Sequence, residues 1–160
     1  MATHTPEWLA QRLDSERQKT VVFFSDLTSH QAEQEVYLEG STWRVREVLA
    51  HLVASEAAHV RLIQNVVSGG AGAPEDFNID RFNESQLAPL RAVPLAELLR
   101  RFDDLRRQTV RLVASFTLED LEKQGRQPFL GMTTVEEMIQ LIYRHVQIHL
   151  RDIRRVLGMM

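Results

Sequence analysis

The stretch TTVEEMIQLIYRHVQIHLRDIRRVL, residues 133–157, decides the fold of this chain. Its apolar residues recur every three or four positions, which is the period of one face of an α-helix. The residues of this stripe are Val135, Met138, Ile139, Ile142, Val146, Ile153 and Val156. The capping-box pattern Thr133-x-x-Glu136 marks where such a helix begins. The stretch therefore predicts a long amphipathic helix that buries one face and ends near Leu157.

Two histidines lie inside this apolar stripe. His145 and His149 are four residues apart, so their imidazoles lie on the same helix face. This spacing allows two ligands on an unbroken helix to reach one metal ion. Because a buried imidazole needs a hydrogen-bonding or metal partner, the alternative is that each ring binds a Glu or a backbone carbonyl in the core. The pair alone leaves both interpretations open.

Helical periodicity also predicts three earlier helices. The first begins at Thr5-Pro6-Glu7, with Thr5 as its cap, and its stripe extends to Leu27. The second runs from near Thr42-Trp43 to about Val67, where Ser68 and three closely spaced glycines end it. The third follows Pro94, and its stripe extends from Leu95 to Val113. Four helices of about 20–26 residues predict an all-α four-helix bundle formed by a single domain, residues 1–160.

The connections between these helices suggest the topology. The longest connection, 69–93, is long enough to cross the whole bundle and is expected to contain a short helix around Asp80–Leu87. Such a crossover allows helices two and three to run parallel, which predicts an up-down-down-up arrangement. Ser29–Gly40 is expected to be a polar connection, and Thr117 with Asp120 to cap one further helical turn. The segment 123–132 is expected to be a loop because it contains two glycines and a proline.

Composition limits the function classes. The 160 residues include no cysteine, so disulfides, zinc ribbons and a protein thiol nucleophile are excluded. The net charge of −3, from 19 Lys and Arg against 22 Asp and Glu, predicts no nucleic-acid partner. The arginines of helix three are interleaved with acids, which is typical of a solvated helix face. No run approaches the roughly 18 apolar residues of a membrane span, and residues 1–15 lack the apolar core of a signal peptide. We therefore expect no membrane partner and a cytoplasmic location.

A third histidine would turn the pair into a metal site. His51 and His59 both lie on the second helix. A helical wheel places His59 near the middle of the apolar stripe and His51 at its edge. Periodicity alone slightly favours His59, but the spacing does not decide between the two.

The motif Trp43-Arg-Val-Arg-Glu-Val-Leu-Ala-His51-Leu52, followed downstream by His145-Val-Gln-Ile-His149, resembles the DinB-like family of bacterial metal-binding bundles. In that family a histidine eight residues after a tryptophan joins an HxxxH pair around one divalent metal. The resemblance therefore implies that His51, His145 and His149 are the ligands. It extends over nearly the whole chain, including the linker motif Asp80-Arg-Phe-Asn83. Arg44 replaces the family's usual Ser or Thr, so Ser41 or Thr42 is expected to cap the helix.

The resemblance also implies a function. Three imidazoles leave a position on a nickel or zinc ion for water or substrate. Related bundles include the mycothiol-dependent maleylpyruvate isomerase and thiol S-transferases, so a low-molecular-weight thiol is a candidate cofactor. The first hypothesis is a metal-dependent transferase or hydrolase of a small molecule. The second is a non-catalytic, stress-related metal-binding protein. Homodimers are common among related bundles and are expected here.

Other polar residues have weaker predicted roles. Glu56 lies near the centre of the helix-two stripe, where it could carry protons, although an ion pair with an arginine of a neighbouring helix is the favoured alternative. Asp80 and Asn83 could border the cavity mouth and bind a cofactor, or could cap a short helix. Asp152 lies on the same flank as the HxxxH pair and is either a partner of a ligand or part of a surface ion pair.

Overall fold

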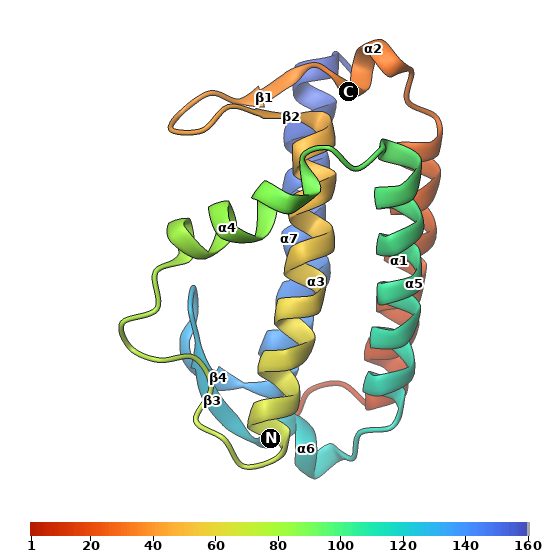
Figure 1. Ribbon diagram of the computed structural model, residues 1–160. Coiled ribbons are helices and arrows are strands. Elements are labelled where there is room, and N and C mark those ends of the chain that lie inside the picture. Colours follow the sequence, from red (N-terminus) through yellow and green to blue (C-terminus); the bar gives the residue numbers. More distant parts are fainter. Residues whose placement is uncertain (160) are drawn as a thin grey trace.

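A computed structural model describes residues 1–159 and contains four long helices that lie side by side (Figure 1). These are α1 (Pro6–Ser25), α3 (Val45–Val67), α5 (Leu95–Ala114) and α7 (Val135–Leu157). In Figure 1 the chain ascends in α1, descends in both α3 and α5, and ascends again in α7. The predicted all-α four-helix bundle with up-down-down-up topology is confirmed.

The core lies between these helices, because α1 and α3 each pack against both α5 and α7. One cluster of buried apolar side chains includes Phe24, Leu49 and Phe102, and a second includes Leu13 and Ile139. Burial of a Leu or Phe side chain contributes roughly 1.5–3 kcal/mol. The apolar stripes of the sequence thus hold the bundle together.

The start of α7 differs from the prediction by one residue. Thr134 is the cap, and its side chain accepts a hydrogen bond from the backbone N–H of Glu137 at 3.2 Å. Thr133 lies one residue before this cap, where it pairs with Gly125 in a β-ladder. Glu136 instead accepts a hydrogen bond from the backbone N–H of Thr3 at 2.8 Å. The predicted capping box is therefore wrong, although the helix that follows it is present.

The connection between α1 and α3 is more ordered than predicted. It contains the short helix α2 (Ser29–Ala32) and an antiparallel pair of strands, β1 (Glu35–Tyr37) and β2 (Trp43–Arg44). Helix α3 consequently begins at Val45 rather than near Thr42, and neither Ser41 nor Thr42 caps it. The Glu47 carboxylate accepts a hydrogen bond from the backbone N–H of Arg44 at 2.8 Å, which satisfies a donor at this helix end.

The segment predicted to be a loop after α6 (Leu118–Glu122) forms a hairpin of β3 (Gln124–Gln127) and β4 (Gly131–Thr134). Thr117 caps α6 as expected. The glycines that suggested a loop have specific positions in the hairpin. Gly131 has a positive φ of 72°, and a Cβ atom at Gly125 would collide with the side chain of Val66. The loop prediction is therefore wrong, because these glycines allow the hairpin to turn and to pack on α3.

The crossover from α3 to α5 contains α4 (Ile79–Leu87) and the 3₁₀ turn η1 (Ala88–Leu90). It runs along α3 from one end of the bundle to the other (Figure 1). Asn78 caps α4 by accepting a hydrogen bond from the backbone N–H of Arg81 at 2.9 Å. The crossover thus forms a separate layer on one side of α3.

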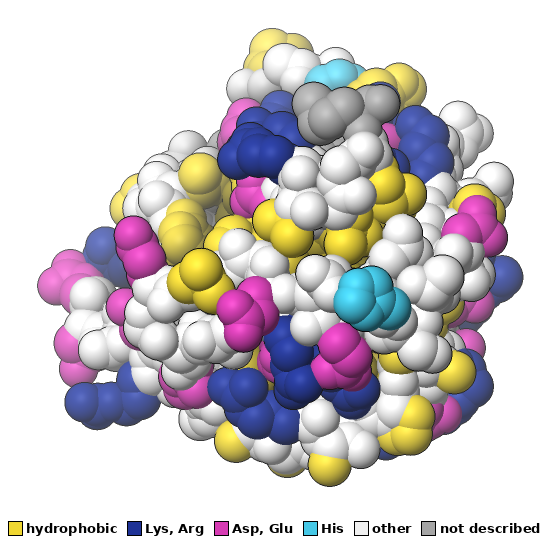
Figure 2. All heavy atoms as spheres, turned by 90° about the horizontal axis from the view of Figure 1, so that it is seen from above, with side chains coloured by type: hydrophobic (Ala, Val, Ile, Leu, Met, Phe, Trp, Pro, Cys, Tyr) yellow, Lys and Arg dark blue, Asp and Glu magenta, His cyan; other side chains and the backbone are white. Residues whose placement is uncertain are grey.

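The surface carries charges of both signs. Figure 2 views the end of the bundle near the C-terminus, where Lys and Arg side chains are interspersed with Asp and Glu. Among residues 1–159, no helix is both long enough and apolar enough to cross a membrane.

Candidate metal centre

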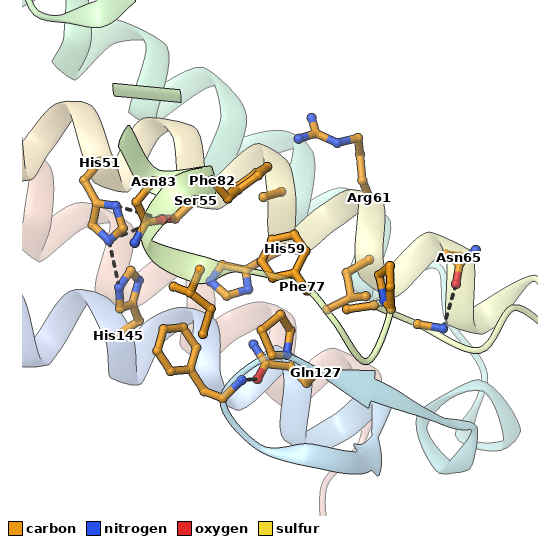
Figure 3. Close-up of a pocket in the computed structure, with 18 residues that line it drawn as sticks. His51, Ser55, His59, Arg61, Asn65, Phe77, Phe82, Asn83, Gln127 and His145 are labelled. Carbon is orange, nitrogen blue, oxygen red and sulfur yellow. Dashed lines mark hydrogen bonds between the residues drawn. The ribbon is translucent and has the colours of Figure 1, made fainter. Parts of the chain in front are cut away.

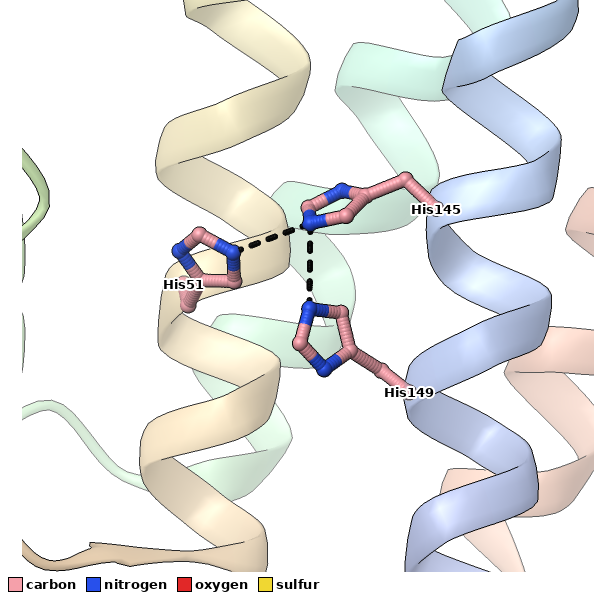
Figure 4. Close-up of side chains that lie close together, drawn as sticks. All are labelled: His51, His145 and His149. Carbon is pink, nitrogen blue, oxygen red and sulfur yellow. Dashed lines mark hydrogen bonds between the residues drawn. The ribbon is translucent and has the colours of Figure 1, made fainter. Parts of the chain in front are cut away.

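Three histidine side chains meet between two antiparallel helices (Figure 4). His51 comes from α3, and His145 and His149 come from successive turns of α7. The Nε2 atom of His145 lies 3.1 Å from Nε2 of His51 and 3.0 Å from Nε2 of His149. One potential ligand atom from each residue lies within 4.8 Å of the other two. We call these three residues the histidine cluster.

The donor set of the cluster suits a divalent ion. Imidazole nitrogens bind zinc at about 2.0–2.1 Å. Two nitrogens separated by 3.0–3.1 Å would subtend an angle of about 95° at such an ion, so they would occupy neighbouring coordination positions. A single ion would satisfy all three lone pairs, whereas hydrogen bonds among three neutral rings cannot, because each N–H serves one acceptor.

Tyr37 on β1 holds one ring of the cluster in place. Its hydroxyl lies 2.6 Å from Asp152 Oδ2 and 2.8 Å from His149 Nδ1. Because a carboxylate can only accept, the hydroxyl donates to Asp152 and accepts from the Nδ1–H of His149. This tautomer leaves the lone pair of His149 on Nε2, which faces His145. Burial and the bond to Asp152 raise the pKa of Tyr37, so the hydroxyl stays protonated.

Of the two interpretations of Asp152, the structure supports a partner of a ligand. Its contacts with Arg151 and Arg155 are long, at 3.7 and 3.8 Å, and both arginines are exposed. Sequence analysis missed Tyr37, because it lies in a polar connection without a helical pattern.

Burial keeps the cluster neutral. It lowers the pKa of His51 to about 3, with a further contribution from the neighbouring rings of His149 and His59. It lowers the pKa of His149 to about 4, although Asp152 acts in the opposite direction. Burial also lowers the pKa of His145. Neutral imidazoles are the form that coordinates metals.

Trp43, the first residue of the motif, packs against the cluster. Its ring centroid lies 4.8 Å from that of His51 and 6.2 Å from that of Tyr37. The tryptophan therefore covers one side of His51 and orients the strand that carries Tyr37.

His59 lies outside the cluster, although the helical wheel slightly favoured it. Its ring meets the edge of His145 at a centroid distance of 5.9 Å and lines a neighbouring pocket. The stripe of α3 is shared between α5 and α7, and His51 lies on the side that faces α7. A wheel finds the centre of a buried face but does not show which neighbouring helix each part of that face contacts.

Glu56 forms the ion pair that the sequence analysis favoured as the alternative to a catalytic role. Its carboxylate, 2% exposed, accepts two hydrogen bonds from Arg106, at 2.8 and 3.0 Å, and one from Thr109 at 2.7 Å. Both partners lie on α5. Because the carboxylate oxygens are occupied by α5, the geometry matches the ion-pair alternative and argues against a role in proton transfer.

Asp80 and Asn83 lie at a cavity mouth and do not cap α4, since Asn78 does. Both border a groove of about 600 Å³ that also reaches Tyr37 and His149. Asn83 additionally lines a second pocket on the other side of the cluster. Their role in binding a cofactor stays a prediction.

The second pocket, of about 290 Å³, is mainly apolar and begins at the histidine cluster (Figure 3). His51 and His145 lie at one end and Asn65 at the other, with His59 and Gln127 between them. The walls come from α3, the crossover and the β3–β4 hairpin. The apolar lining residues are Ala58, Leu62, Ala73, Pro74, Phe77, Ile79, Phe82, Pro128 and Phe129. The arrangement places a mainly apolar cavity next to the histidine cluster.

Solved structures share this fold. YfiT from Bacillus subtilis, described as a probable metal-dependent hydrolase with an unusual four-helix bundle topology, is 18% identical with a TM-score of 0.77. That similarity covers 100% of this chain and 91% of YfiT. The mycothiol-dependent maleylpyruvate isomerase is 15% identical with a TM-score of 0.72, over 92% of this chain and 59% of the isomerase. These similarities establish the fold.

A further structure bears on the expectation of no nucleic-acid partner. The colibactin self-resistance protein ClbS, solved in complex with a double-stranded DNA, is 18% identical with a TM-score of 0.70, over 96% of this chain and 98% of ClbS. A protein of this fold can therefore bind DNA, and our expectation rests on charge composition alone.

No curated protein is significantly similar to this chain in sequence. Residues 4–153, however, match the DinB superfamily. This match spans most of the chain and includes Trp43 and the three residues of the histidine cluster. The protein is a member of the DinB superfamily.

Proposed function

We propose that this protein is a divalent-metal-dependent enzyme that acts on a small molecule. One observation carries the proposal: the Nε2 atoms of His51, His145 and His149 converge, and two of these residues, His51 and His145, line the end of an apolar pocket. A storage or purely structural metal site needs no such cavity, whereas a catalytic metal needs room for a substrate beside it. The pocket therefore favours the enzyme over the non-catalytic metal-binding protein.

The three histidines would hold one nickel or zinc ion. A bound divalent ion polarises a carbonyl group, lowers the pKa of water or stabilises a thiolate. Tyr37 and Asp152 would keep His149 in the tautomer that coordinates through Nε2. The apolar pocket would take the main substrate and exclude water from it.

We further propose a thiol S-transferase activity, in which a low-molecular-weight thiol supplies the sulfur nucleophile that this cysteine-free chain lacks. The sulfur forms a bond to an electrophilic carbon while the bond from that carbon to its leaving group breaks. The leaving group departs with the electron pair of that bond, and the thiol proton passes to solvent or to the leaving group. Two spaces adjoin the cluster, so the groove beside Asp80 and Asn83 can receive the thiol while the apolar pocket receives the electrophile. The fold shared with the mycothiol-dependent isomerase supports this assignment.

The proposal includes a homodimer, as resembling bundles commonly form, and a cytoplasmic location. Sedimentation equilibrium of the purified protein tests the first point.

Turnover measurements test the activity. The nickel- and zinc-loaded protein is incubated with 1-chloro-2,4-dinitrobenzene and a panel of low-molecular-weight thiols, and separately with aryl esters. We expect metal-dependent turnover that His145→Ala abolishes. His30→Ala is the matched control, because His30 is exposed and its ring bonds to Gln34 rather than to the cluster. Metal binding without turnover of any thiol or ester would favour the non-catalytic alternative.

A further inference from the structure

The side chain of Gln127 presents a hydrogen-bond donor to the apolar pocket. Gln127 is only 2% exposed and lies at the end of β3. Its Oε1 atom accepts hydrogen bonds from the backbone N–H groups of Phe129 at 2.6 Å and Leu130 at 2.8 Å. A backbone N–H can only donate, so the oxygen must face the turn and the amide nitrogen must face the other way.

The amide nitrogen of Gln127 has no hydrogen-bond partner among residues 1–159. In the same range, the one inaccessible side-chain polar atom without a hydrogen-bond partner is the Nε of Arg12. The Gln127 amide nitrogen also has no partner, so it must be accessible from outside the protein interior. The amide nitrogen therefore reaches the pocket that Gln127 lines. A buried donor without an acceptor costs free energy, so water or a ligand in the pocket must accept a hydrogen bond from this nitrogen.

His59 adds a second polar group to the same part of the pocket. Within the described chain, the ring nitrogens of His59 have no hydrogen-bond partner, and both remain accessible from the pocket that His59 lines. Figure 3 shows His59 and Gln127 extending into the cavity from α3 and β3, between the cluster and Asn65. The surrounding wall is formed by aromatic and aliphatic side chains, among them Phe77 and Phe82.

We infer that the pocket takes an apolar, ring-sized molecule that carries a carbonyl or similar hydrogen-bond acceptor, to which the Gln127 amide donates. Phe77 and Phe82 contact the apolar body, and the acceptor lies beside His59. Gln127 thereby determines specificity in the reaction proposed above. The inference rests on the proposed function for its role in catalysis, but the binding itself requires no turnover.

A pair of nearly isosteric probes tests this inference. 2-Acetylnaphthalene carries a carbonyl oxygen where 2-isopropenylnaphthalene carries a CH₂ group. A neutral hydrogen bond to a protein donor corresponds to about 2- to 12-fold in affinity. We expect the wild-type protein to bind the acetyl compound more tightly by that factor, measured as dissociation constants from NMR titration. Equal affinity for the two probes would overturn the inference without the need for any variant.

Gln127→Glu is the decisive substitution, because glutamate keeps an oxygen for the Phe129 and Leu130 N–H groups and removes the donor. We expect the preference for the acetyl compound to disappear. Asn65→Asp is the matched control: it makes the same amide-to-acid change at the far end of the pocket, where Oδ1 accepts from the Gly72 N–H at 3.0 Å. The preference should persist there.

The titrations are run on the protein as purified and after zinc loading. A preference seen only with zinc would mean that the carbonyl binds the ion, which contradicts the role of Gln127. An intact preference in a protein without turnover would refute the proposed enzyme but keep the binding inference. Turnover without a preference for the acetyl compound would support the proposed enzyme and refute the binding inference.

Discussion

Removing the Glu56 carboxylate is expected to destabilise the bundle strongly. Arg106 is fully buried, and two of its hydrogen bonds go to Glu56. In Glu56→Ala the guanidinium keeps one hydrogen bond, to the Leu13 carbonyl at 3.3 Å, and its position over the Phe102 ring. Breaking a buried ion pair by removing one partner costs about 3–5 kcal/mol. At about 2–4 °C per kcal/mol for a chain of this length, the melting temperature falls by roughly 6–20 °C.

Equilibrium urea unfolding followed by circular dichroism measures the loss. The double variant Glu56→Leu with Arg106→Met removes both charges, and we expect it to regain most of the stability lost in the single variant. Glu97→Ala removes an acid that pairs with Arg100 and Arg101 on the surface, and it should leave the midpoint nearly unchanged. A Glu56→Ala protein within about 1 kcal/mol of wild type would refute the ion-pair argument. A Glu56→Ala protein with unchanged stability but no turnover would instead support a role of Glu56 in proton transfer.

Three other outcomes follow from the histidine cluster. Elemental mass spectrometry should find no metal in His51→Ala and normal metal in His59→Ala; the opposite result would make His59 the third ligand. Tyr37→Phe removes the hydroxyl that orients His149 and should weaken metal affinity about 10- to 100-fold in a chelator competition, and unaltered affinity would contradict the tautomer assignment. Burial lowers the pKa of His51 and His149 below the unfolded value of about 6.5, so the unfolded chain binds more protons in acid. The metal-free protein should therefore lose stability as pH falls from about 6.5 through 4, and urea midpoints that stay constant across that range would disprove the burial argument.

The long helices were predictable because several signals agree along each of them. For α5, the apolar stripe and the proline before it indicate the same boundaries that the structure shows. The topology followed from the 69–93 connection, which is the longest of the three and is long enough to cross the bundle. Local pattern and chain length therefore determine the arrangement of these helices.

The short strands could not be predicted in this way. Each of β1, β2, β3 and β4 spans two to four residues, too few for an alternating pattern to stand out. Their pairing depends on contacts with α3 and α7, which a local pattern does not contain. Tyr37 was missed for the same reason, because its partners lie 112 and 115 residues away in sequence.

The candidate site was predictable in part. The spacing of His145 and His149 shows that they share a face of α7, but not what meets them there. Periodicity could not choose between His51 and His59, because both lie in or beside one stripe; the family resemblance singled out His51, and the structure places that residue in the cluster. The donor role of Gln127 requires the hairpin, which the sequence did not reveal.

The layered construction of the pocket has a consequence for how such proteins diversify and for how they can be engineered. The histidine cluster lies on two helices of the bundle, whereas most of the opposing pocket wall lies on the crossover and the hairpin. Substitutions at positions such as Phe77 or Phe129 can therefore change the shape of the cavity without repacking the core that aligns the ligands. A combinatorial library restricted to residues 73–83 and 127–130 would sample new pocket shapes while the helices that carry the histidine cluster stay unaltered.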